Sequence, residues 1–187
     1  MEASMLRQAD PFARLGLLRA FRVVEGDLVE AHRAASLRWH PDRFALAGEA
    51  ARLQAEDEMA LLNEAFDILK DPIRRAEALL TLEGFRKSET TDMSSSPEFL
   101  MEMMELKEQV AEDIRENRQE ALKAKHQEMM CLEWDEIDRI KTAFDQLEAV
   151  ARTDNDTRTR IFRQIRALLN QINYLRKTRE EISRALI

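Results

Sequence analysis

The chain has 187 residues with 44% hydrophobic and 35% charged side chains, and its four glycines and four prolines are few enough to indicate a helical protein. A formal net charge of −7 argues against nucleic acid as the main partner, and the single cysteine excludes an intramolecular disulfide or a zinc site built on paired thiolates. No window approaches the roughly 18 apolar residues of a membrane span, and the start resembles neither a secretion signal nor an organelle presequence, so we expect a cytoplasmic, all-α protein with no membrane partner.

Prolines mark where the helices of the N-terminal half begin and end. Asp10-Pro11 and Asp71-Pro72 each place a capping oxygen before a proline, a pattern typical of a helix start. Pro41 follows an apolar-periodic run, so it ends that helix and opens a loop. Together these signals predict helices at 11-18, 27-39, 49-69 and 72-82, with a loop at 40-48.

The chain is predicted to contain two domains. Residues 85-96 are polar with three consecutive serines, which is typical of a linker. Ser96-Pro97 then repeats the helix-start pattern. We therefore predict an N-terminal domain over 9-84 and, over 97-187, a three-helix bundle with helices at 98-127, 132-151 and 157-186.

Apolar residues recur at spacings of three and four on the last two helices, which predicts one core face on each. On the middle helix the expected core residues are Trp134, Ile137, Ile140, Phe144, Leu147 and Ala151. On the last helix they are Ile161, Ile165, Leu168, Ile172, Leu175 and Ile182. Cys131 is expected to be a packed thiol.

The helix after Pro97 carries apolar residues on two sides. One stripe is the predicted core face and consists of Phe99, Met103, Leu106, Val110 and Ile114. The other side, which we call the Met-Glu face, consists of Leu100, Met101, Met104, Glu105, Glu108 and Glu112. Large apolar side chains among carboxylates are a candidate docking surface, and methionine adapts well to a partner. Two plain alternatives are ordinary scattered surface residues and a helix buried from two sides.

The string Arg38-Trp39-His40-Pro41-Asp42-Arg43-Phe44 is the most specific in the chain. A helix ends there and a rigid turn, the His-Pro-Asp turn, presents His40, Pro41 and Asp42. An acid-base pair or a metal site is one interpretation, but a general base needs an orienting group and a metal needs three or four ligands. A helix-ending turn that only caps backbone groups is another. We predict no catalytic residue, no metal site and no cofactor.

In its context this string resembles the J-domain signature of co-chaperones that act on DnaK-type chaperones. Other segments recur in register: Asp10-Pro11-Phe12, Leu15-Gly16-Leu17, Leu62-Asn63-Glu64-Ala65-Phe66, Asp71-Pro72, Arg75-Ala76-Glu77 and Leu82-Glu83-Gly84. This set covers residues of about 9-84 and resembles the HscB family of iron-sulfur cluster assembly, in its bacterial form. The chain departs from that pattern at His32, Ala35, Ala78 and Thr178.

The second domain extends the resemblance. Phe99-Leu100-Met101-Glu102 and the residues up to Glu108 are similar to the segment with which HscB proteins hold the cluster scaffold protein. The resemblance implies six scaffold-binding positions, which are the six residues of the Met-Glu face: Leu100, Met101, Met104, Glu105, Glu108 and Glu112. It also implies that Tyr174 borders this face and is a seventh scaffold-binding residue.

The resemblance implies an adaptor that is not itself an enzyme. Its implied partners are an HscA-like chaperone of the DnaK type and an IscU-like scaffold protein. The implied chaperone-binding residues are Arg33, Arg38 and Arg43, which steer, and His40, Pro41 and Asp42, which promote ATP hydrolysis on the chaperone. Two other hypotheses are a J-domain adaptor for a different client and a structural helical protein in which the turn is incidental.

Overall fold

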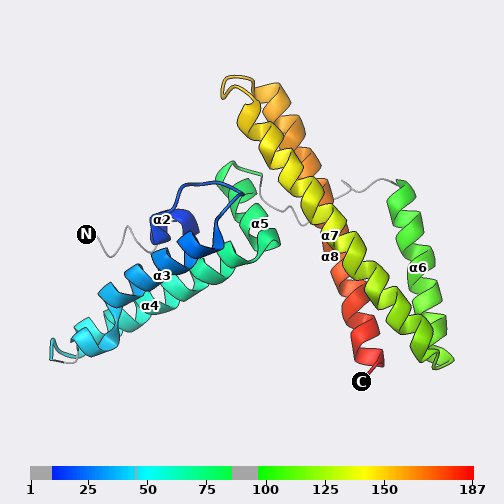
Figure 1. Ribbon diagram of the computed structural model, residues 1–187, viewed down its shortest axis with the longest axis horizontal. Coiled ribbons are helices and arrows are strands. Elements are labelled where there is room, and N and C mark those ends of the chain that lie inside the picture. The colour runs from blue at the N-terminus through cyan, green and yellow to red at the C-terminus, as the bar shows by residue number, and fades with distance from the viewer. Residues whose placement is uncertain (1–9, 45, 86–96) are drawn as a thin grey trace. The chain divides into compact units, whose positions relative to one another are not determined.

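The structure is a computed structural model that describes residues 10–44, 46–85 and 97–187, except for the side chain of Pro41. Every regular element within these ranges is helical, which confirms the predicted all-α class (Figure 1). The chain divides into two compact units, Met1–Gly84 and Phe85–Ile187. Apart from Phe85, the predicted linker lies outside the described residues, as does the predicted cap Ser96.

The first unit is a helical hairpin with short flanking helices. It consists of α2 (Pro11–Leu15), α3 (Glu25–Trp39), the short 3-10 helix η1 (Pro41–Phe44), α4 (Glu49–Lys70) and α5 (Pro72–Leu82). Helices α3 and α4 form the hairpin, with η1 at its tip, and α2 packs against them (Figure 1). The first helix is shorter than predicted because Gly16, with a φ of 69°, ends it in the left-handed conformation.

Both aspartate caps predicted for this unit are present. Asp10 Oδ1 accepts a hydrogen bond of 2.9 Å from the amide of Ala13, and Asp71 Oδ1 accepts one of 2.7 Å from the amide of Ile73. Each satisfies an amide that the first turn of a helix leaves without a partner. The caps fix where α2 and α5 begin, and therefore how they enter the core.

The core of the first unit is centred on one face of α4, where buried residues recur every three or four positions. Its buried apolar residues are Phe12, Leu15, Phe21, Leu28, Ala55, Leu62, Ala65, Leu69, Ile73, Ala76, Leu79 and Leu80. Glu58 is also buried and lies 3.7 Å from Arg14, measured from Oε2 to Nη1. His32, a departure from the family pattern, packs its ring 4.6 Å from that of Phe66 and so serves the hairpin as an aromatic residue does.

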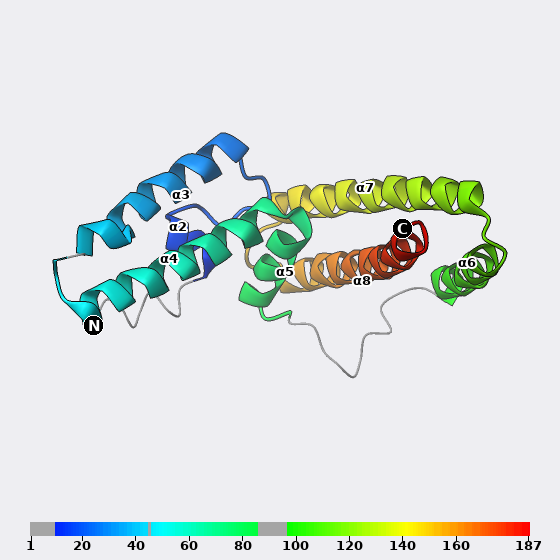
Figure 2. The same ribbon diagram turned by 90° about the horizontal axis from the view of Figure 1, so that it is seen from below.

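The second unit is a three-helix bundle of α6 (Pro97–Arg115), α7 (Gln119–Ala149) and α8 (Asn155–Ala185). Helices α7 and α8 form a long hairpin (Figure 2). Helix α6 packs on the N-terminal part of α7 and the C-terminal part of α8 (Figure 1). The core that joins all three helices consists of Met103, Val110, Leu122, Met129, Leu175 and Ile182.

The break between the first two helices of this unit was predicted wrongly. The sequence placed it near residues 128-131, but α6 ends at Arg115 and α7 begins at Gln119. Asn117 takes a left-handed conformation with a φ of 54°. The amides of Asn117 and Arg118 donate to the carbonyls of Ile114 and Asp113, the pattern of a Schellman cap. Asparagine tolerates this conformation better than most residues, so no glycine marks the break.

Three residues that were predicted to be packed on the middle helix are on the surface. Ala151 is exposed, because α7 ends at Ala149. Trp134 is 66% exposed and Cys131 is exposed as well. The neighbouring Glu133 takes the buried position instead, because its Oε1 lies 2.6 Å from Arg176 Nε and its Oε2 lies 3.2 Å from Arg179 Nη2, both on α8. Two arginines of α8 thus determine which face of α7 turns toward the core.

The predicted seam of α8 is confirmed, since all six of its apolar residues are buried. Phe85, placed by prediction in the linker, belongs structurally to this unit. Its ring lies 4.8 Å from that of Phe162, and its carbonyl accepts a hydrogen bond of 2.7 Å from Arg166 Nη2. The second unit therefore begins at Phe85.

Candidate functional site

The His-Pro-Asp turn is held rigidly at the tip of the α3–α4 hairpin. Helix α3 ends at Trp39, His40 is extended with a φ of −60° and a ψ of 126°, and a single turn of 3-10 helix follows. The amide of Arg43 donates to the carbonyl of His40 at 3.0 Å. The rings of Trp39 and Phe44 stack 6.0 Å apart and bracket the turn. The aromatic pair and the hydrogen bond fix how the turn is presented.

Arg43 supports the turn from within. Its Nη1 donates to the carbonyl of Leu37 at 2.9 Å, which satisfies an acceptor that the end of α3 leaves open. A positive charge also suits a helix C-terminus. The sequence predicted a partner-binding role for Arg43, and the structure adds this local one.

His40 and Asp42 face outward. His40 Nδ1 lies 3.6 Å from Asp42 Oδ2, and the two side chains are 52% and 91% exposed. Within the described ranges, no group of three or more His, Cys, Asp and Glu side chains is placed to hold a metal ion. Exposed polar side chains on a turn whose backbone is held in place suit recognition of a protein surface.

The outer face of α3 continues the charged surface beside this turn. Arg33 donates from Nε and Nη2 to the carboxylate of Glu30, at 3.1 and 2.9 Å. These hydrogen bonds raise the pKa of Arg33 and lower the pKa of Glu30. Leu37, one turn after Arg33, is 57% exposed on the same face and was not predicted as a site residue. Helical periodicity alone places it on the same face as Arg33.

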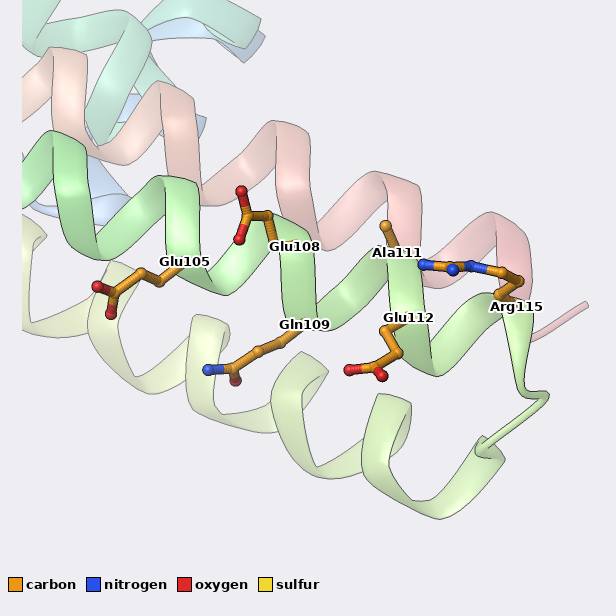
Figure 3. A pocket seen from close by; sticks show the side chains of 6 residues that line it. All are labelled: Glu105, Glu108, Gln109, Ala111, Glu112 and Arg115. Atoms are coloured by element: carbon orange, nitrogen blue, oxygen red, sulfur yellow. The ribbon is translucent and has the colours of Figure 1, made fainter.

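The Met-Glu face lies on the outside of α6. Met101 and Met104 are 64% and 65% exposed, Leu100 is half-buried, and the glutamates are exposed. The opposite stripe packs into the bundle, with Met103 and Val110 buried, which confirms the predicted core face. Figure 3 shows the glutamates around an open hollow lined by Glu105, Glu108, Gln109, Ala111, Glu112 and Arg115.

Tyr174 of α8 extends this surface at its apolar end. The tyrosine is 39% exposed, and the ring of Phe99 meets it edge-on with centroids 6.3 Å apart and a 72° angle between the ring planes. Phe99 is on α6, beside Leu100. The fold thus brings Tyr174 close to the Met-Glu face although about seventy positions separate them in sequence.

A buried charge cluster joins α6 to α7 below this face. Asp113 is 4% exposed, and its Oδ1 accepts a hydrogen bond of 2.7 Å from Arg118 Nε while its Oδ2 contacts Lys125 Nζ. Arg118 also lies 3.4 Å from Glu112 and 2.9 Å from Glu116. The sequence did not reveal this cluster, which fixes the angle at which α6 presents its outer face.

We expect the Asp113 cluster to stabilise the fold at neutral pH and to lose this stabilising contribution in acid. The hydrogen bond from Lys125 lowers the pKa of Asp113 below its ordinary value of about 3.9. A carboxyl whose pKa is lower in the folded chain stabilises folding above its unfolded pKa, and the contribution disappears as the pH falls through the folded pKa. Asp113→Asn should therefore be less stable than wild type at pH 7 and converge with it in acid.

Urea unfolding of both proteins between pH 7 and pH 2.5 measures this difference. Asp138→Asn, which changes an exposed aspartate of α7, is the matched control and should follow wild type throughout. A stability difference that stays constant across the pH range would show that the effect of Asp113→Asn does not come from its charge.

Comparison with models of protein families gives no match. A co-chaperone HscB homolog of Neisseria meningitidis is 35% identical over 167 residues, which cover 89% of this chain and 93% of the relative. The chain belongs to the HscB family of co-chaperones.

Two further comparisons, both with HscB of Vibrio cholerae, agree with that assignment. The HscB homolog of Vibrio cholerae is 42% identical over 99 residues, and the match spans 58% of that relative's length. The solved structure of chaperone HscB from Vibrio cholerae superposes with a TM-score of 0.72 at 29% identity, over 94% of this chain and 96% of the other. The all-α fold of this chain is therefore shared with an HscB structure over most of its length.

Among the residues that the structure describes, no helix has the length and apolar character needed to span a membrane.

Proposed function

We propose that this co-chaperone is an adaptor with two working surfaces. Its first unit, a J-domain, stimulates the ATPase of an HscA-like chaperone of the DnaK type through the His-Pro-Asp turn. Its second unit delivers an IscU-like iron-sulfur cluster scaffold bound on the Met-Glu face. The observation that carries this proposal is the outward exposure of both surfaces, each on its own unit.

On the chaperone side the first unit supplies recognition, and the chaperone supplies the chemistry. Arg33 and Arg38 are exposed on α3 and steer the unit toward an acidic surface. The turn then docks with little loss of conformational entropy, because the ring stack and the hydrogen bonds of Arg43 already hold it. His40 and Asp42 contact the chaperone and shift it toward hydrolysis.

On the scaffold side the Met-Glu face combines two kinds of contact. Met101, Met104 and the edge of Tyr174 offer apolar area that a partner buries. The glutamates beside them select a partner with cationic side chains. Since one chain carries both surfaces, the bound scaffold reaches the chaperone at a raised effective concentration.

Direct binding tests this proposal against a J-domain adaptor for another client. The full chain is immobilised and titrated with purified cluster scaffold protein. We expect saturable binding that Glu108→Lys weakens by about tenfold, as for reversal of one charge in a complementary interface. Glu148→Lys, an exposed glutamate of α7 away from the face, is the control and should bind like wild type. Absence of binding by wild type contradicts the scaffold role.

A further inference from the structure

The Met-Glu face continues for one more helical turn. At about 100° per residue, Ala111 and Arg115 fall within the arc that runs from Leu100 to Glu112. Both line the same hollow as Glu105, Glu108 and Glu112 (Figure 3). Arg115 is exposed, and in the part of the chain that the structure describes its guanidinium forms no ion pair.

This face becomes less negative toward the C-terminal end of the helix. Glu105 and Glu108 make its middle negative. Toward the C-terminal end, Arg118 lies 3.4 Å from Glu112, although it also pairs with Asp113 and Glu116. Arg115 adds a cation that forms no ion pair with any residue that the structure describes. Ten residues separate Glu105 from Arg115, or about 15 Å along the helix. That exceeds the Debye length of about 8 Å at physiological salt, so a partner senses the two ends separately.

Resting on the proposed scaffold docking, we infer that Arg115 is a specificity determinant of the Met-Glu face and that the scaffold places a carboxylate against it. A row of glutamates alone would bind a row of partner cations equally well with the partner segment in either orientation along α6. With a cation at one end of the row, a partner bound in the reversed orientation would place one of its own cations against that cation. Repulsion between these like charges disfavours the reversed orientation. Ala111 has only a methyl side chain, so a partner carboxylate can reach the guanidinium and bind it with two hydrogen bonds.

Affinity measurements on charge variants test this inference. The dissociation constant for the scaffold is measured for wild type, Arg115→Gln, Arg115→Glu and the control Arg163→Glu, an exposed arginine of α8 away from the face. We expect Arg115→Gln to weaken binding by about threefold and Arg115→Glu by about tenfold, with Arg163→Glu unchanged. In about 1 M salt the differences should vanish, because the Debye length falls to about 3 Å.

A cross-link identifies the partner group. Carbodiimide activates a carboxylate and joins it to a lysine amine in contact, forming an amide while the reagent leaves as a urea. The Arg115→Lys chain, mixed with scaffold and carbodiimide, should yield a peptide pair linking the new lysine to an Asp or Glu of the scaffold. Circular dichroism checks that each variant is folded, since Arg115 also stabilises the C-terminal turn of α6.

The outcomes separate this inference from the function on which it rests. Wild-type affinity in Arg115→Glu, while Glu108→Lys still weakens binding, overturns the role of Arg115 and leaves scaffold docking intact. Failure of the wild-type chain to bind the scaffold contradicts the proposed function and this inference together. A loss of affinity that persists in 1 M salt also contradicts it, because the effect would then not be electrostatic.

Discussion

His40→Gln and Asp42→Asn are each expected to leave the ATPase rate of an HscA-like chaperone near its unstimulated level, while scaffold binding stays normal. Asp42→Asn keeps the size of the side chain and removes only its charge. That side chain is 91% exposed, so its loss leaves the fold intact. The expected loss of stimulation therefore reports a missing contact with the chaperone.

Steady-state ATP turnover by the purified chaperone measures this effect over a range of co-chaperone concentrations. Asp27→Asn is the matched control, because it removes an exposed aspartate from the other end of α3. It should stimulate like wild type. Full stimulation by Asp42→Asn would mean that the His-Pro-Asp turn is only a helix-ending turn.

The paired substitution Leu100→Ala with Met104→Ala should weaken scaffold binding by about thirtyfold. Truncating each side chain removes on the order of 1 kcal/mol of apolar contact that forms only in the complex, and about 2 kcal/mol in total corresponds to about thirtyfold in affinity. Met104 is 65% exposed in the free chain, so little of its share of the loss comes from the fold. Leu100 is half-buried, so the stability of the paired variant is measured as well.

Titration calorimetry with the scaffold measures the loss, and thermal unfolding checks that the bundle is retained. Leu132→Ala truncates a leucine of α7 that is 38% exposed, and it should bind like wild type. Unchanged affinity in the paired variant, with folding retained, removes the Met-Glu face from the mechanism.

Local signals predicted much of this fold. Asp10 and Asp71 cap the helices that their sequence positions indicated, because the capping oxygen and the proline act within one turn. The periodicity of α8 predicted its buried face, because the spacing of apolar residues within one helix determines which side is apolar. Periodicity also separated the exposed side of α6 from its core stripe. Arg115 falls within the same arc, although it was not predicted to belong to the face.

Contacts between different elements explain the two buried carboxylates that the sequence did not predict. Glu133 is buried in place of Trp134 only because Arg176 and Arg179 approach it from another helix. Asp113 is buried because its partners follow a turn that asparagine forms without a glycine signal. Partners that lie on another element leave no mark on the periodicity of one helix.

In the proposed function, one chain joins a chaperone-activating turn to a scaffold-binding face. The most direct test is ATP turnover by the HscA-like chaperone with the full-length chain, in the presence and absence of scaffold. We predict that the chain and the scaffold together raise ATP turnover well above the sum of the increases that each causes alone. With the Leu100→Ala plus Met104→Ala variant, turnover should fall to that sum. Turnover that the chain does not change, with or without scaffold, would contradict the claim.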